Sequence, residues 1–210
     1  MVESPRILLK RPSMPQAAPL TSPRLPILLL ALAFPLVPWP ASAAEIESVY
    51  TKLDLKLCKD VTPEDVKDYG SVSICPGHDG IDVRVAEGDL RIFVSYGANA
   101  ANQTATYETI PQFNTIGETL EWRVKREGDK LKPFATILRF SWDVDGKKGS
   151  TLVVTKLGKD DACHMAYVVA SGNPKANEEA RAIADRDAGA FTCKQDRAKH
   201  YGSGGQENKL

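Results

Sequence analysis

The sequence predicts a mainly β protein of the α+β class: an antiparallel β-sandwich or barrel-like sheet with one C-terminal α-helix packed on it and two disulfides. Several segments alternate apolar and polar residues with a period of two, and turns rich in Gly and Asp separate them. One segment near the C-terminus repeats its apolar residues at helical spacing. The chain has four cysteines, all in the part that we expect to be exported.

Residues 1–43 have the features of a secretory signal peptide. A basic residue, Arg24, precedes the short apolar run 27–37, and the small residues 41–43 form an A-x-A cleavage site. The run is shorter than the ~20 residues of a membrane-spanning helix and contains proline. We therefore predict cleavage near Ala43, no transmembrane segment in the mature chain, and a location in the periplasm or outside the cell. Met14 is an alternative start that would leave an ordinary signal peptide.

The remaining chain has the length of one domain, which we place at residues 44–196. Residues 1–43 contain four of the 27 basic residues and one of the 27 acidic residues, so the mature chain has a net charge of about −3. No segment is strongly basic, which argues against a nucleic-acid partner. Residues 197–210 are polar and Gly-rich, and we expect this tail to be disordered.

An even number of cysteines in an oxidising compartment indicates disulfides. Three pairings are open, and we favour Cys58–Cys75 with Cys163–Cys193 because these close the shorter loops. The competing interpretation, a metal site, lacks any C-x-x-C spacing.

Residues 81–97 give the clearest structural signal, a β-hairpin. Ile81, Val83 and Val85 alternate with polar residues, and a second alternation begins at Leu90. A Gly88–Asp89 loop suits a type II′ turn and would place Val85 opposite Ile92 and Val83 opposite Val94. Arg84 and Phe93 would then share the other face of this hairpin.

Further elements follow from the same patterns. We expect an opening strand at 49–57, a short helical turn at 62–70 and a strand at 72–75. Residues 98–116 have no clear period and form a long loop. Strands follow at 120–125, 134–142, 152–155 and 163–169, and the helix runs from Lys175 to about Asp187.

The chain resembles a family of small exported, periplasmic bacterial proteins to which no activity is assigned. The residues that carry this resemblance include Cys75-Pro76-Gly77, Glu121-Trp122-Arg123, the segment 133–137, Cys163-His164 and Ala176-Asn177 of the predicted helix. The resemblance covers most of the mature chain. It implies export, and it assigns no functional residue.

The candidate binding residues lie in and before the 81–97 hairpin. His78 and Asp79 could hold a cation or exchange a proton, although a Gly-rich turn explains them equally well. Arg84, Arg91 and Phe93 would form a basic and aromatic binding patch if nothing covers that face. His164 should face away from the side chains of Cys163, Met165 and Tyr167, and we interpret it as a histidine of the sheet surface. Trp122 and Trp142 are predicted to be core residues.

Enzyme motifs are absent from the sequence. It has no nucleophile elbow, Walker, dinucleotide-binding or H-E-x-x-H motif. Asp143-x-Asp145-Gly146 starts like a calcium loop, but lysines follow, which favours a hairpin turn. We therefore predict no catalytic residue, no cofactor and no metal. The favoured function is an envelope binding or interaction module, with an envelope protein or glycan as partner. The alternative is an envelope-polymer hydrolase that uses the His78/Asp79 region or a carboxylate pair from Glu118, Glu121 and Asp143.

Overall fold

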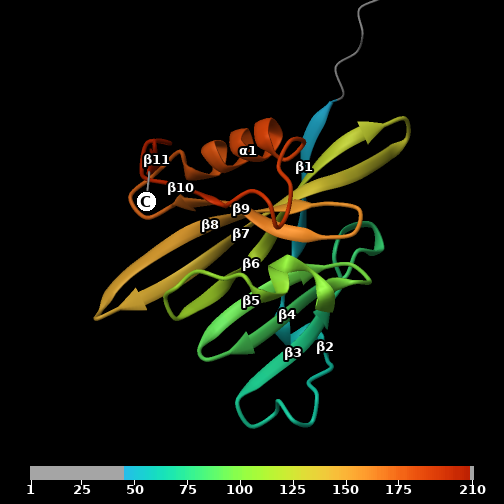
Figure 1. Cartoon of the computed structure of the whole chain (residues 1–210), viewed down its shortest axis with the longest axis vertical. Helices are drawn as coiled ribbons and strands as arrows, with labels where there is room; N and C mark the ends of the chain where they lie inside the picture. Colours follow the sequence, from blue (N-terminus) through green and yellow to red (C-terminus); the bar gives the residue numbers. More distant parts are fainter. Residues whose placement is uncertain (1–44, 209–210) are drawn as a thin grey trace, which may run out of the picture. The chain divides into compact units, whose positions relative to one another are not determined.

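Two β-sheets and one helix make up the fold in the computed structural model, which describes residues 45–208. The large sheet, sheet A, has the strand order β1-β6-β7-β8-β9-β10-β11, and the small sheet, sheet B, has the order β2-β3-β4-β5 (Figure 1). Neighbouring strands are antiparallel except for β9 and β10, which are parallel. Sheet A contains β1 (Ile46–Lys52), β6 (Asn114–Glu127), β7 (Lys130–Val144), β8 (Lys147–Leu157), β9 (Ala162–Val169), β10 (Lys199–Tyr201) and β11 (Glu207–Asn208). Sheet B contains β2 (Lys59–Asp60), β3 (Gly70–Cys75), β4 (Val83–Gly88) and β5 (Arg91–Tyr96), and the helix is α1 (Ala176–Asp187).

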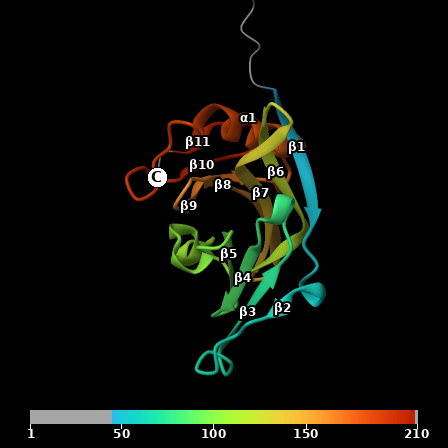
Figure 2. The same ribbon diagram turned by 90° about the vertical axis from the view of Figure 1, so that its right-hand side faces the viewer.

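Sheet A is covered on both faces, by sheet B on one and by α1 on the other (Figure 2). Between the sheets, Trp122 and Phe140 of sheet A pack with Val83 and Val94 of sheet B. Under α1, the side chains are mostly small, including Ala176, Ala180 and Ala184 of the helix itself. The small alanine side chains let the helix lie close to the sheet.

These observations confirm the predicted mainly β class with one helix and two disulfides. The described strands do not close into a barrel. The apolar–polar alternation of residues 120–125 would predict one buried face, but α1 covers the other face of β6 and buries Glu121 and Arg123, each only 6% exposed. Alternating polarity normally marks a sheet with one wet face. Here the polar side chains are paired with each other beneath the helix.

The β4–β5 hairpin forms where it was expected, but its predicted turn and cross-strand pairs are wrong. Asp89 and Leu90 form the loop, both with positive φ (52° and 57°), so the turn is of the type I′ class and not type II′. Val85 pairs with Val94 and Val83 with Tyr96, which is a shift of two residues. Because side chains alternate with a period of two, this shift leaves every residue on its predicted face.

The helix and both disulfides agree with the prediction. Cys58 is bonded to Cys75, and Cys163 is bonded to Cys193. The second bond joins β9 to the segment after α1, so it holds the C-terminal part of the chain against sheet A. The carboxamide oxygen of Asn173 accepts the backbone N–H of Lys175 (3.0 Å) just before the helix begins.

The prediction of a disordered tail at 197–210 is wrong for residues 199–208. In this segment β10 pairs with β9, and β11 pairs with β10, so the domain extends beyond its predicted end at residue 196. The segment is polar because it lies at the sheet edge, but Tyr201 is buried against the core under α1. A single buried aromatic residue anchors a segment whose composition suggested disorder.

The predicted long loop at 98–116 ends earlier, because β6 begins at Asn114, and residues 98–113 together with Asn114 protect the free edge of β5. The side-chain amide of Gln103 accepts the Tyr96 N–H (3.0 Å) and donates to the Tyr96 carbonyl (2.7 Å). Asn114 Oδ1 accepts the Ile92 N–H (3.0 Å), and the Thr109 hydroxyl donates to the Ile92 carbonyl (2.6 Å). These side chains replace a neighbouring strand and so shield the edge from pairing with other chains.

The predicted signal peptide, its cleavage site and the alternative start at Met14 lie outside the described residues. Within residues 45–208, no helix combines the length and apolar character needed to span a membrane.

Candidate functional site

The outer face of sheet B, which points away from sheet A, carries a mixed basic and apolar surface. Strand pairing places its side chains in two rows across the sheet. The first row contains Lys59, Ile74, Arg84 and Ser95, and the second contains Val72, Ala86 and Phe93. Side chains in such rows are direct neighbours on one face. The surface that they form is called the outer face below.

The outer face is open in its centre and closed at two margins. At the β5 margin, short 3-10 segments pack against the strand, and Ser95 is completely buried. Val72 is also buried, at the start of the face near the 61–69 loop. Between these margins, Ile74, Arg84 and Phe93 are half-buried. The sequence left open whether this face is covered, and the structure shows that its centre is accessible.

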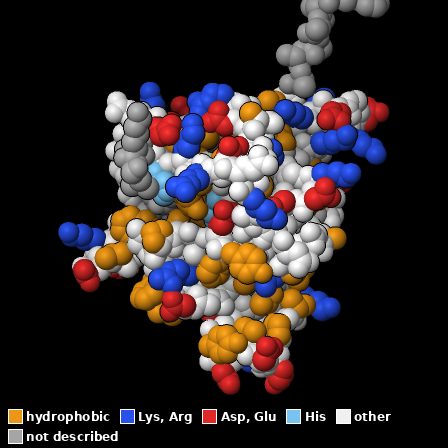
Figure 3. Space-filling model, viewed as in Figure 1, with side chains coloured by type: hydrophobic (Ala, Val, Ile, Leu, Met, Phe, Trp, Pro, Cys, Tyr) orange, Lys and Arg blue, Asp and Glu red, His pale blue; other side chains and the backbone are white. Residues whose placement is uncertain are grey.

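Exposed apolar side chains concentrate around sheet B. Of the ten large hydrophobic residues that are exposed in the described chain, seven lie between residues 55 and 113. They are Leu55, Leu57, Val61, Tyr69, Leu90, Tyr107 and Phe113. Figure 3 shows hydrophobic side chains gathered over the lower half of the molecule, where β3, β4 and β5 lie, with basic side chains among them. Clustered exposed apolar surface of this kind is typical of interaction sites.

Arg84 lacks a compensating charge. No carboxylate of the described residues lies within 4.0 Å of Arg84 or of Lys59, whereas Arg91 is paired with Asp89 in the turn. The Nη1 atom of Arg84 is buried and has no hydrogen-bond partner in the described structure. Burial lowers the pKa of the Arg84 guanidinium, and the nearby phenol of Tyr107 acts in the opposite direction. A buried donor without an acceptor is costly, so Arg84 is an energetically unfavourable position within sheet B.

A shallow hollow of about 530 Å³ adjoins the outer face at the end near the turn. Its lining includes Arg91, Phe93, Tyr107, Glu108 and Tyr167. The guanidinium of Arg91 lies 5.3 Å from the ring centroid of Phe113, within the range of a cation–π contact. Burial raises the pKa of the Glu108 carboxyl.

The structure brings together three of the five predicted binding residues, namely Arg84, Arg91 and Phe93. His78 instead packs between the sheets, with its ring centroid 6.1 Å from that of Trp122. The length of β4 lies between His78 and Arg91, and at the rise of a β-strand this length is on the order of 17 Å. His78 therefore lies away from the surface around Arg91, and a binding role for His78 and Asp79 stays a prediction.

Sequence reasoning missed Lys59, Ile74 and Tyr107. The first two join the outer face only through pairing of β2 and β3 with the hairpin. Tyr107 lies in a segment without periodicity and is 79% exposed. No sequence signal marked Tyr107, because its exposure and its place near Arg84 depend on the fold.

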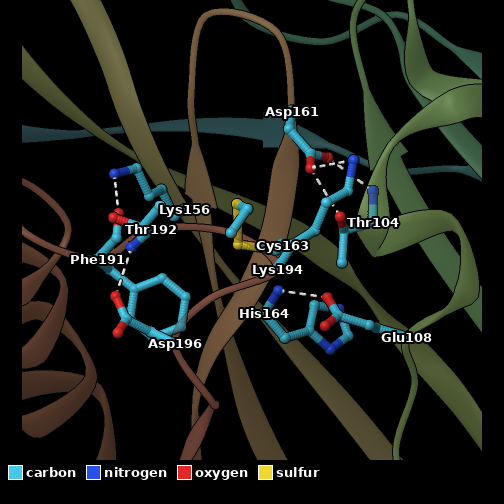
Figure 4. Close-up of a disulfide and its surroundings, with 11 residues drawn as sticks. Thr104, Glu108, Lys156, Asp161, Cys163, His164, Phe191, Thr192, Lys194 and Asp196 are labelled. Atoms are coloured by element: carbon cyan, nitrogen blue, oxygen red, sulfur yellow. Dashed lines mark hydrogen bonds and ion pairs between the residues drawn. A yellow bond between two sulfur atoms is a disulfide. The ribbon is translucent and has the colours of Figure 1, made fainter.

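His164 lies in a β-bulge on β9, which corrects its predicted position. Val154 pairs with Ala166 and Thr155 with His164, so Met165 is the extra residue. The bulge turns Tyr167 to the same side of the sheet as His164, whose Nδ1 lies 2.9 Å from the Tyr167 hydroxyl. Figure 4 shows the backbone N–H of His164 donating to the Glu108 carboxylate (2.6 Å), next to the disulfide of Cys163. His164 is 2% exposed, so it is a core residue and not a residue of the sheet surface.

We expect His164 to make the protein sensitive to acid. Burial lowers the pKa of His164 from 6.5 to about 3, so the unfolded chain takes up this proton while the folded chain does not. Stability is therefore lost as the pH falls below 6.5, by ~2 kcal/mol between pH 7.5 and 5. Urea unfolding at several pH values should show this loss in the wild type and its absence in His164→Gln. Equal pH profiles for the two proteins would contradict the assignment.

The carboxylates proposed for a hydrolase do not form a free pair. Asp143 accepts the Gly146 N–H (2.9 Å) in the β7–β8 turn, which confirms a hairpin turn there. Glu118 and Glu121 both line a cavity of about 330 Å³ between sheet A and α1. Glu121, however, accepts hydrogen bonds from the Arg181 guanidinium (2.6 and 3.3 Å) and from the Ser48 hydroxyl. A carboxylate held in this way stabilises the fold and is a poor acid or nucleophile.

A wider opening, of about 810 Å³, lies where the two sheets separate near the hairpin tips. Leu90, Phe113 and Trp142 line it. Trp142 lies flat against Gly149 of the next strand, where a Cβ atom would come within 2.1 Å of the ring. Trp122 is fully buried as predicted, but Trp142 is only half-buried and borders this opening.

Among residues 45–208, no group of three or more His, Cys, Asp or Glu side chains is arranged to hold a metal ion. Compared with known proteins, the chain matches no family model, no curated protein and no solved structure.

Proposed function

We propose that this chain is an exported binding module of the cell envelope that holds its partner on the outer face of sheet B. Export to the periplasm or the cell exterior, and membership of the family of small exported bacterial proteins, are parts of this proposal. Two disulfides support an oxidising compartment. The hydrolase alternative is less well supported, because Glu121 is engaged by Arg181 and Ser48.

One observation carries the proposal: the accessible centre of the outer face combines apolar side chains with an uncompensated arginine. Ile74 and Phe93 are half-buried on the outer face, and Arg84, which pairs with Ile74, has no carboxylate within 4.0 Å in the described chain. Aromatic and arginine side chains on a partly desolvated surface are what protein interfaces use for affinity.

Affinity capture tests this proposal. The tagged mature chain is incubated with an envelope extract, and the bound material is compared with that bound by Ala86→Arg. Ala86 lies beside Phe93 in the centre of the outer face, so a long charged side chain there obstructs docking. We expect the specifically bound material to fall at least tenfold.

Ser203→Arg is the matched control, because Ser203 is exposed in the β10–β11 turn of sheet A. This variant should bind as the wild type does. Equal capture by the wild type and Ala86→Arg would show that the outer face is not the binding surface.

A further inference from the structure

Two buried hydrogen-bonding groups lie side by side on the outer face without partners. Arg84 and Ser95 are directly paired across β4 and β5, so their side chains are neighbours on the same face. Arg84 Nη1 and Ser95 Oγ are both buried, and neither has a hydrogen-bond partner in the described structure. Buried polar groups in folded proteins are nearly always satisfied. Ser95 is completely buried beside the 3-10 segments, so of these two residues only Arg84, which is half-buried, can offer a donor to an acceptor from outside the chain.

The charge of the surface indicates which acceptor fits. Lys59 and Arg84 stand in one row of the outer face, and no carboxylate of the described residues lies within 4.0 Å of either. The mature chain as a whole has a net charge of about −3, so this basic area runs against the average of the molecule. A guanidinium group binds a carboxylate through two parallel hydrogen bonds.

The surroundings of Arg84 favour a protein over a lipid surface. Arg84 is half-buried in the sheet and does not protrude, and Arg91 at the tip is already paired with Asp89. Attraction to a membrane depends on several protruding basic residues that can reach the headgroups. An arginine flanked by Phe93 and Tyr107 matches the composition of a protein–protein hot spot instead.

We propose that Arg84 receives an Asp or Glu side chain of a protein partner, with Phe93 and Tyr107 packing around the resulting ion pair. This inference rests on the proposed function, since it names the partner class for the same face. It makes Arg84 the residue on which recognition depends most.

The experiment places a photo-crosslinking amino acid, p-benzoylphenylalanine, at position 107 of the tagged mature chain. Tyr107 is 79% exposed beside the outer face, so the probe should not disturb folding. The same probe at Tyr50, which is 52% exposed on sheet A, is the control. After irradiation in an envelope extract, mass spectrometry identifies the crosslinked peptide. We expect a protein peptide with an Asp or Glu near the crosslink from position 107 and not from position 50.

The partner is then purified and its affinity measured for Arg84 variants. Arg84→Met should weaken binding by ~30-fold or more, which is the usual range for truncating a buried, hydrogen-bonded charge at an interface. Arg84→Lys should recover part of this loss. Replacing the partner's carboxylate by its amide should weaken binding to the wild type equally and should add little to the effect of Arg84→Met. Arg197→Met, at an exposed arginine before β10, should change affinity less than twofold.

Several results would overturn the inference: a crosslink to lipid, no crosslink from position 107, or a partner whose affinity changes less than twofold in Arg84→Met. Unchanged unfolding midpoints of the variants exclude misfolding as the cause of any loss. If Ala86→Arg abolishes capture but Arg84→Met does not, the binding face stands and only the carboxylate inference fails. If Ala86→Arg binds normally, both proposals fail.

Discussion

Arg123→Met should lower the free energy of unfolding by ~3 kcal/mol or more, as is usual when one partner of a buried ion pair is removed. The Arg123 side chain is 8% exposed and donates two hydrogen bonds to Asp185 of α1 (2.8 and 2.6 Å). It also donates to the Ser48 hydroxyl of β1. Without the guanidinium, the Asp185 carboxylate stays partly buried beneath the helix with no paired cation. The hydrogen bonds through which Arg123 joins β6 to α1 and β1 are also lost. Urea unfolding monitored by circular dichroism measures the loss.

Arg126→Met is the matched control on the same strand. Arg126 is 43% exposed and pairs with Glu47, also at the surface. Exposed pairs contribute less than ~1 kcal/mol because water screens them. If both variants lose the same stability, the burial of Arg123 is not what makes its pair important.

Replacing Cys163 and Cys193 together by alanine should lower the free energy of unfolding by ~3.6 kcal/mol, from the loop-closure entropy of a 30-residue separation. The bond holds the segment after α1 against β9, and β10 with the buried Tyr201 follows that segment. The loss should therefore include the C-terminal strands. Hydrogen exchange of residues 199–201 should become faster in the double variant than exchange of the β6–β7 amides.

The corresponding change at Cys58 and Cys75 serves as a comparison. This bond has a separation of 17 residues, so its predicted contribution is smaller by ~0.5 kcal/mol on the same model. Faster exchange at 199–201 in this variant as well would show that the second disulfide does not act locally.

The sequence contained enough local information for most strands, the helix and the cysteine pairs. Period-two alternation assigned Arg84 and Phe93 to one face of the hairpin, and the shift of two residues in register did not change that assignment. The turn itself was mispredicted because Leu90 adopts a left-handed conformation that a leucine rarely takes. Gly88, which appeared suited to the turn, ends β4 instead.

Other features depend on contacts between distant segments, and no local pattern encodes them. The bulge at Met165 inverted the expected relation between His164 and Tyr167. The burial of Arg123 arises from α1, which lies about sixty residues further along the chain. The outer face is a similar case. Its Arg84 and Phe93 follow from alternation, but Lys59 and Ile74 join them only through strand pairing, and the accessibility of the centre is a tertiary property.

Hydroxyl-radical footprinting of the captured complex shows whether the outer face of sheet B is the binding surface. It reports the solvent exposure of individual side chains with and without the partner. If the outer face of sheet B is the binding surface, oxidation of Tyr107 and Phe93 should fall severalfold in the complex, while Tyr50 on sheet A, 52% exposed, should react as in the free protein. Protection of Tyr50 with unchanged oxidation of Tyr107 and Phe93 would show that the partner binds elsewhere than on the outer face.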